Sequence, residues 1–306
     1  MKTTREQLLA TLACGVVLAA APWLLSDFLL ALALSCLMYA ALALSWAMFC
    51  GPTNYLSLAT SAFFGLGAYV TAWSLGTLPY GAAVLAGGLA GSAFAALIGA
   101  GVLHLRGAYF AVITFGLGEL ALHSITYTEK TYFHTAGRII GDPPENAVIY
   151  WTVLALALAA AATAILVRSS RLGTALRGIG SDEERAQTLG VATRRVKVLA
   201  FSASAFFPGA LGAAMAVRWT YIEPLSVFNP FIGFQTVLIA MLGGAQTLLG
   251  PIVSAVFFTL VSEFLRLRFP YVFLILLGLL LIVLILYLPG GLASLLQRRF
   301  WRAGAR

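Results

Sequence analysis

One run of the chain places a carboxylate and an imidazole at helical spacing. Glu119 and His123 lie four residues apart in Ile113-Thr-Phe-Gly-Leu-Gly-Glu-Leu-Ala-Leu-His123, so they share one face of a helix. If this run crosses a bilayer, the carboxylate costs about 2.5–3.5 kcal/mol to insert and should face protein or water. The pair would suit pathway lining, gating or a proton relay. A structural link between Glu119 and His123 or the backbone is the alternative.

Two Gly- and Pro-rich breaks interrupt the apolar runs. Gly51-Pro52-Thr53-Asn54 and Gly243-Gly244-Ala-Gln246-Thr-Leu-Leu-Gly-Pro251 are both followed by a Phe-Phe pair. Non-helical backbone at membrane depth is tolerated only against protein or a wet cavity, and paired breaks of this kind surround the pathway in many transporters. Close helix packing through small residues is the alternative. The full set of candidate pathway residues is Asn54, Ser57, Thr60, Phe63, Gly65, Gly67, Thr114, Glu119, His123, Gly243, Gly244 and Gln246.

The densest charge lies in residues 168–197. Ser181 and Glu184 have the spacing of a capping box, and Gly190 is a natural C-terminal stop. The short helix between them would carry Ala186 and Leu189 on one side. It is too polar for lipid and too short to be stable alone, so we expect it to rest against a partner. A solvated loop that only fixes topology is the alternative.

The chain carries no motif for chemistry of its own. Its three lysines follow Met1, Glu129 and Val196, so a P-loop Gly-Lys pair is absent, as are G-x-S-x-G and H-E-x-x-H. The three cysteines have no zinc or disulfide spacing. We therefore expect no enzyme activity, no cofactor and no metal site, and any transport must draw energy from a partner ATPase or an ion gradient.

The composition indicates a membrane protein. Of 306 residues, 61% are hydrophobic and 10% are charged, which excludes a soluble enzyme, a nucleic-acid binder and a disordered chain. The predicted fold is an all-α polytopic helix bundle forming one domain over residues 1–306. The ten expected spans are 7–25, 28–49, 61–78, 81–103, 107–126, 148–167, 198–217, 231–249, 251–266 and 271–289. Eight spans would remain if the two broken segments are re-entrant.

The distribution of basic residues predicts the orientation. With the N-terminus inside and ten crossings, 14 Lys and Arg residues lie on the inner side and 5 on the outer side. This bias satisfies the positive-inside rule and explains the net charge of +8 without nucleic acid. Both termini and the loop 168–197 are then cytoplasmic, and the loop 127–147 is extracellular. Glu263 and Arg266 fall near the outer end of a span and are spaced to pair.

Four stretches in order along the chain carry a family resemblance. They are Leu58–Tyr69, Leu105–Glu119, Ser170–Arg177 running on to Asp182-Glu183 and Leu189-Gly190, and Met241–Pro251 followed by Leu288–Leu292. With them the chain resembles permease subunits of branched-chain amino acid ABC importers of the LivM type. The family commonly has Gly-His or Gly-Gln before Ala-Phe-Phe, where this chain has Ala59-Thr60-Ser61.

The resemblance implies a multi-pass bacterial inner-membrane permease without catalytic activity. Its implied partners are a second permease subunit, two cytoplasmic ATPases, an external solute-binding protein and membrane lipid. The solute would be a branched-chain or hydrophobic amino acid, or a related small solute such as urea or an amide. The coupling helix that enters an ATPase groove would comprise Asp182, Glu183, Glu184, Arg185, Ala186, Leu189 and Gly190. A proton-coupled secondary transporter using Glu119 and His123 is the alternative function, and a non-transport scaffold is disfavoured by the broken segments.

Overall fold

The computed structural model describes residues 4–279 except residues 75, 136, 142, 220 and 274. More than half of the expected span 271–289 lies outside the described residues, and the motif at 288–292 and the basic residues from 298 onward lie wholly outside them. The described chain is almost entirely helical, with one antiparallel pair of two-residue strands in which Arg138 pairs with Ile222 and Ile139 with Tyr221. The elements are α1 (Thr4–Ala19), α2 (Ala21–Leu24), α3 (Asp27–Thr53), α4 (Thr60–Ser74), α5 (Tyr80–Val102), α6 (Ala108–Thr128), the π-helix η1 (Glu129–Phe133), β1 (Arg138–Ile139), α7 (Asn146–Ser169), α8 (Arg171–Ser181), α9 (Glu183–Thr188), α10 (Thr193–Ala216), β2 (Tyr221–Ile222), α11 (Pro224–Val227), α12 (Pro230–Gly243) and α13 (Leu249–Arg268).

Eight helical segments of the described chain are long and apolar enough to cross a membrane. They correspond to eight of the ten expected spans, which confirms the polytopic all-α bundle. The expected span 61–78 differs, because α4 has only 15 residues and is about 22 Å long. That falls short of a hydrocarbon core of about 30 Å. Residues 54–59, which are not helical, precede α4 and extend its path through the bundle.

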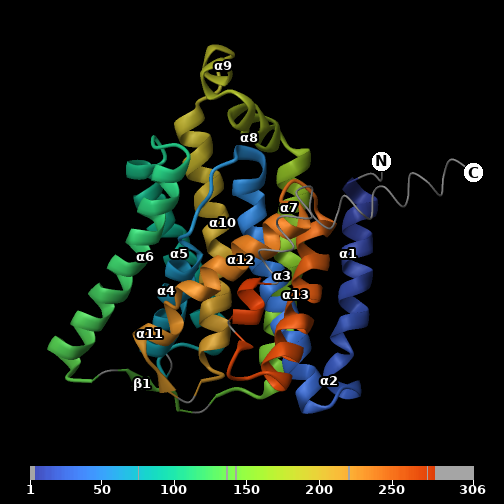
Figure 1. The fold of residues 1–306 in the computed structure, drawn as a ribbon, viewed down its shortest axis with the longest axis vertical. Helices are drawn as coiled ribbons and strands as arrows, with labels where there is room; N and C mark the ends of the chain where they lie inside the picture. The colour runs from blue at the N-terminus through green and yellow to red at the C-terminus, as the bar shows by residue number, and fades with distance from the viewer. Residues whose placement is uncertain are drawn as a thin grey trace, which may run out of the picture.

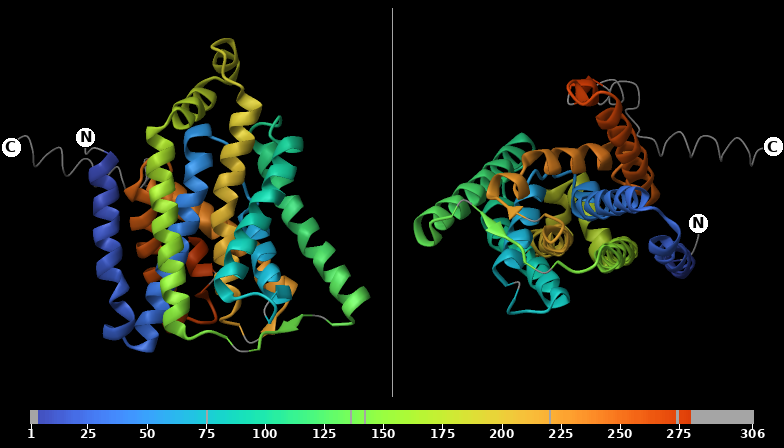
Figure 2. Two further views of the ribbon diagram at one scale, coloured as in Figure 1. Left: turned by 180° about the vertical axis from the view of Figure 1, so that it is seen from behind. Right: turned by 90° about the horizontal axis from the view of Figure 1, so that it is seen from below.

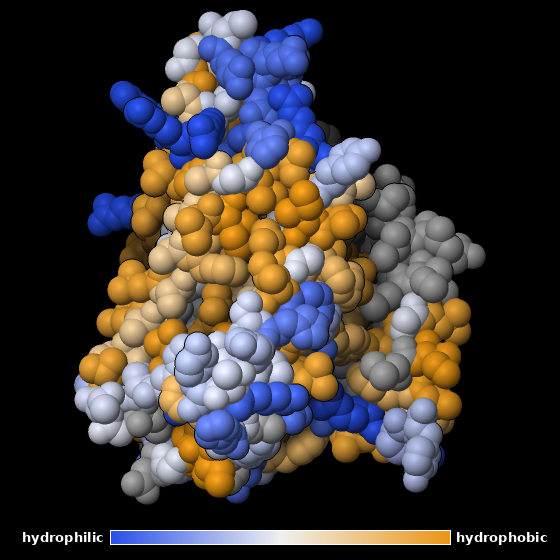
Figure 3. All heavy atoms as spheres, turned by 90° about the vertical axis from the view of Figure 1, so that its left-hand side faces the viewer, coloured by the Kyte–Doolittle hydropathy of each residue, from blue (hydrophilic) through white to orange (hydrophobic). Residues whose placement is uncertain are grey.

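The long helices run roughly antiparallel between two polar ends (Figure 1). The α8–α9 elbow projects from one end, called here the α9 end, and the β1–β2 pair lies at the other, called the β1 end (Figures 1 and 2). An apolar band covers the side wall between hydrophilic ends (Figure 3). This is the surface expected where lipid surrounds the middle of a bundle and water its ends.

Helices α4, α5 and α10 pack almost backbone to backbone. A Cβ atom on Gly67 would meet the Gly209 carbonyl, one on Gly209 would meet the Gly87 carbonyl, and one on Gly212 would meet the Phe64 carbonyl. Small residues permit this approach, and dispersion contacts between the backbones stabilise it where apolar burial contributes little. These glycines therefore fix the centre of the bundle.

The two Gly- and Pro-rich breaks meet in space at the α9 end. A Cβ atom on Gly51, at the end of α3, would meet the carbonyl oxygen of Ala245 in the α12–α13 turn. Arg168, at the end of α7, donates hydrogen bonds to the carbonyls of Ala245 (3.3 Å) and Thr247 (2.8 Å). The carbonyl groups of this turn have no helical hydrogen-bond donors, and the charged guanidinium supplies the hydrogen bonds that buried backbone groups require.

Candidate functional site

The charged segment between α7 and α10 folds into two helices joined at a sharp corner. Asp182 has an extended backbone, and its carboxylate accepts hydrogen bonds from the amides of Glu184 (3.0 Å) and Arg185 (3.1 Å). Asp182 therefore caps α9, and the prediction that Ser181 does so is wrong. Ser181 ends α8, where its hydroxyl donates to the Gly178 carbonyl. Gly190 follows α9 at φ +85°, a backbone conformation that favours glycine, which confirms the predicted stop.

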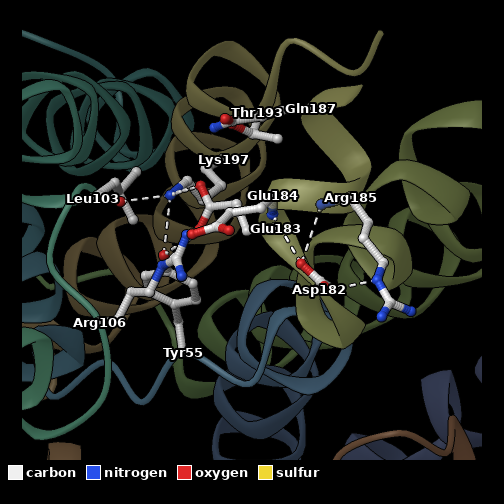
Figure 4. Close-up of polar contacts among 10 residues, drawn as sticks. All are labelled: Tyr55, Leu103, Arg106, Asp182, Glu183, Glu184, Arg185, Gln187, Thr193 and Lys197. Atoms are coloured by element: carbon white, nitrogen blue, oxygen red, sulfur yellow. Dashed lines mark hydrogen bonds and ion pairs between the residues drawn. The ribbon is translucent and has the colours of Figure 1, made fainter. Parts of the chain in front are cut away.

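A buried charge cluster holds α9 to the bundle (Figure 4). The Glu183 carboxylate, at the first turn of α9, lies 2.6 Å from the Lys197 ammonium of α10 and 3.1 Å from the Arg106 guanidinium. The Tyr55 hydroxyl donates to the same carboxylate at 3.1 Å. Lys197 also donates to Tyr55 (3.0 Å) and to the Leu103 carbonyl (2.6 Å). Four chain segments are thereby tied at one point.

The electrostatics of the cluster favour the ionised carboxylate. Burial alone would raise the pKa of Glu183, but the hydrogen bond and charge of Lys197, with Tyr55 and Arg106, lower it below its ordinary value. The Glu183 charge in turn raises the pKa of Arg106. Glu183 is 9% exposed and Lys197 is 3% exposed, so each charge depends on its partner and not on water.

The two sides of α9 have opposite character. Ala186 is buried, facing Gly178 of α8, whereas Leu189 is 85% exposed at the far tip. The prediction that Ala186 and Leu189 share a side is therefore wrong, because the helix ends at Thr188 and the chain turns before Leu189 packs. Glu184 and Arg185 are also exposed. An apolar tip flanked by charges is left without a contact inside the described chain.

The cluster is continuous with the non-helical segment that precedes α4. Tyr55 opens this segment, the indole of Trp46 donates to the Ser57 carbonyl at 2.8 Å, and the Leu58 amide donates to the Thr114 hydroxyl at 3.0 Å. Side chains of α3 and α6 therefore supply the hydrogen bonds that a helix would have made internally. A displacement of Glu183 would act directly on this segment through Tyr55.

The structure does not gather the predicted pathway residues in one cavity. Ser57, Thr60 and Phe63 line a void of about 10 Å³, barely the size of one water. Asn54 and Gln246 line a cavity of about 380 Å³ at the α9 end. Five further candidates pack against other parts of the chain: Gly65 lies against Phe228, Gly67 against Gly209, Thr114 accepts a hydrogen bond from the Leu58 amide, and Gly243 and Gly244 form the end of α12 beside Gly250.

Glu119 and His123 lie on the exposed side of α6. Glu119 is half-buried and His123 is exposed, and neither forms a hydrogen bond or ion pair with a described residue. The i,i+4 spacing therefore does not produce a contact between them here. No group of three or more His, Cys, Asp or Glu within the described ranges is arranged to hold a metal ion.

A second buried ion pair lies at the β1 end. Glu129, fully buried in η1, lies 2.9 Å from Arg138 of β1 and accepts a hydrogen bond from the Tyr69 hydroxyl at 3.2 Å. The Arg138 guanidinium also lies 4.3 Å from the centroid of the Phe133 ring. This cluster fastens the loop after α6 to α4. No pattern in the sequence marks this pair, because a carboxylate just past the end of a span is typical of an ordinary interfacial residue.

Comparison with known proteins identifies the family of this chain. Residues 28–285 match the family model described as "Branched-chain amino acid transport system / permease component". The chain belongs to this family. It is 27% identical to the high-affinity branched-chain amino acid transport system permease protein LivM of Salmonella typhimurium, over 95% of this chain and 76% of that relative, and LivM of Escherichia coli matches equally. LivH of Escherichia coli is 30% identical over 47% of this chain and 46% of its own length. No solved structure matches.

The family and the apolar helices together establish a LivM-type, multi-pass inner-membrane protein. Its relatives are transport permease subunits, which are non-catalytic. The predicted fold class and the family resemblance seen in the sequence are thus confirmed. The sidedness of the loops and the roles of the individual site residues stay predictions.

Proposed function

We propose that this chain is the permease subunit of an ATP-binding-cassette importer and that α9 is its ATPase-coupling helix. The observation that carries the proposal is that α9 is anchored at its base and exposed at its tip. Its tip, ending in exposed Leu189, projects beyond the apolar band, while Glu183 at its base is fixed by a buried ion pair. A helix of six residues is not stable alone, so this anchoring and a partner groove are what it needs.

The basic residues support a cytoplasmic α9 end. Outside the two buried clusters, Arg171, Arg177, Arg185, Arg194 and Arg195 all lie at or beside that end. Positive charge of this density marks the inner face of a bacterial membrane. The loop between η1 and α7 is then external, where a solute-binding protein can dock. The cargo would be a branched-chain or hydrophobic amino acid, or a small relative such as urea or an amide, moved with a second permease subunit.

Reconstitution tests the importer. The chain, its second permease, the two ATPases and the binding protein should give ATP-dependent uptake in proteoliposomes. Uptake by this chain alone under a proton gradient would refute the proposal and favour a proton relay. In that case Glu119→Gln would abolish uptake, and an uncoupler would collapse it at constant ATP.

Two variants test the coupling role of α9. Deletion of residues 182–189 should abolish co-purification of the ATPases while leaving membrane insertion intact. Leu189→Glu should weaken the association with little effect on stability, because the side chain is already in water. Tyr132→Glu changes another exposed side chain at the β1 end, and this matched control should have no effect. Normal assembly of the deletion variant would disprove the docking of α9.

A further inference from the structure

A cavity of about 590 Å³ opens in the β1-end half of the bundle, away from the charge cluster around Glu183. Its walls come from the first half of α3, the chain after α10, the start of α12 and the second half of α13. That volume is within the range of small-molecule sites, about 300–1,000 Å³. It exceeds by far the void lined by Ser57 and Thr60. A free amino acid fits it with room for water.

The polar wall of the cavity holds groups that lack partners. Gln235 of α12 is 5% exposed, and its amide forms no hydrogen bond with a described residue. Ser262 of α13 is 8% exposed, and its hydroxyl also has no partner there. An unpartnered polar group at membrane depth is costly unless water or a solute reaches it. Lipid chains or an apolar helix in the cavity would leave both groups unsatisfied.

The charged groups of the wall carry both signs. Arg218, just after α10, has no carboxylate partner among the described residues. Glu263 of α13 is paired only loosely, with the Arg266 guanidinium 3.9 Å away on the same helix. Such an exposed i,i+3 pair is worth little and is readily exchanged for another partner. Arg266 lines the cavity as well, so the wall offers two guanidinium groups for an anion and one carboxylate for a cation.

The remaining wall is apolar and aromatic. Phe64, Trp219 and Phe231 line it, and the Phe64 and Trp219 rings meet edge to face with centroids 6.5 Å apart. Aromatic walls of this kind bury aliphatic side chains. A neutral solute such as urea would use neither charge and none of this apolar surface.

We infer that this cavity is a solute site for a zwitterionic α-amino acid with an apolar side chain. Arg218 binds the carboxylate, Glu263 binds the ammonium group, and the aromatic wall contacts the side chain. The inference rests on the importer function proposed above and narrows its cargo, favouring amino acids over urea and amides.

Competition for leucine binding tests the two charges. The full chain in nanodiscs is assayed with radiolabelled leucine against leucinamide, 4-methylpentanoate and urea. Leucinamide lacks the carboxylate and 4-methylpentanoate lacks the ammonium group, so each should compete at least tenfold more weakly than leucine, and urea should not compete. Arg218→Gln should lower leucine affinity at least tenfold and remove the preference for leucine over leucinamide. Glu263→Gln should likewise remove the preference over 4-methylpentanoate.

Arg268→Gln is the matched control, since Arg268 is exposed on the same helix end but does not line the cavity. It should bind leucine as the parent does. Wild-type affinity in Arg218→Gln, or equal competition by leucinamide or urea, would overturn the inference.

A second test measures whether leucine protects a cysteine in the cavity wall from a thiol reagent. It does not depend on the Arg218 or Glu263 variants. In a background where Cys14, Cys36 and Cys50 are alanine, Ser35→Cys on the α3 wall should react with a small hydrophilic thiol reagent. Leucine should slow this reaction at least fivefold, while leucinamide should not. Thr77→Cys, exposed in the α4–α5 loop, should show no protection. A Ser35→Cys thiol that never reacts, or that leucine does not protect, overturns the site.

The outcomes separate this site from the importer function. ATP-dependent leucine uptake by the reconstituted complex that is unchanged in Arg218→Gln would leave the importer standing and reject the site. ATP-dependent uptake of urea without leucine would leave the importer standing and reject the zwitterion. Absence of any ATP-dependent uptake would reject the importer, while leucine protection of Ser35→Cys would still report the cavity.

Discussion

Replacing Lys197 by methionine keeps the length of the side chain but removes the ammonium 2.6 Å from the Glu183 carboxylate. Breaking a buried pair by removing one partner costs about 3–5 kcal/mol. The Arg106 guanidinium remains 3.1 Å from the Glu183 carboxylate, but the Arg106 side chain is 56% exposed and therefore stabilises the carboxylate charge only weakly. We therefore expect α9 to lose about 2–4 kcal/mol of its docking free energy.

Thiol accessibility measures this loss. Ala186 is buried on the side of α9 that faces α8, so a cysteine placed there in the cysteine-free background is modified only when α9 lifts. A loss of about 2–4 kcal/mol predicts that Lys197→Met speeds modification roughly 30- to 900-fold. Arg185→Met is the matched control, because Arg185 pairs only with Asp182 at the surface and should change the rate less than threefold, about 0.6 kcal/mol.

The docking of α9 should also depend on pH. The pKa of Glu183 is lowered in the folded chain from an ordinary 4.5, so its contribution is fully present above that pH and is lost as pH falls through the lower value. The gap between Lys197→Met and the parent should therefore be full at pH 7 and should narrow as the pH falls and the carboxylate left without its ammonium takes up a proton. Adding Glu183→Gln to Lys197→Met should restore part of the docking, because no charge is then left buried alone. Equal modification rates in Lys197→Met and Arg185→Met would refute the anchoring role.

Three further predictions follow from close contacts and from the proposed orientation. Gly180→Ala would place a methyl group on the Pro52 carbonyl and should lower the thermal midpoint of the full chain, whereas Gly101→Ala, which faces open space, should not; equal midpoints would contradict the contact. Arg168→Met removes both hydrogen bonds to the α12–α13 turn and should cost about 1–3 kcal/mol in SDS unfolding, and an unchanged curve would show that the turn does not depend on them. Gln187→Cys should be labelled by an impermeant reagent only from the cytoplasm and His134→Cys only from outside; the reverse pattern would disprove the orientation.

The fold was largely predictable because apolar runs of span length have few structural solutions in a bilayer. The cap and contacts of α9 were not. Two adjacent residues, Ser181 and Asp182, are both able to cap a helix, and only the corner after α8 decides that Asp182 does so. Lys197 reads as part of a charged loop in the sequence. In the structure α10 begins at Thr193, and its first turns carry Lys197 beneath α9.

The site residues show the same limit. Glu119 is conspicuous in the sequence because it interrupts an apolar run, yet the carboxylates with buried partners are Glu183 and Glu129. Both lie at helix ends, where charged residues are common, so the sequence does not mark them as site residues. The partners of each carboxylate lie far from it in the sequence or on the other side of a loop. Tyr55 and Glu183 are an example of the first kind. Pairings over such separations depend on tertiary packing, which no local pattern encodes.

The glycine contacts among α4, α5 and α10 limit where the protein can change shape. Helices joined through interdigitated side chains can slide by exchanging rotamers, but at Gly67, Gly209 and Gly212 there is no side chain to rearrange. Any slippage there would force one main chain into another. The three helices should thus travel as a single stiff block, and a permeation step must occur at its borders with α3, α6, α7 and α12.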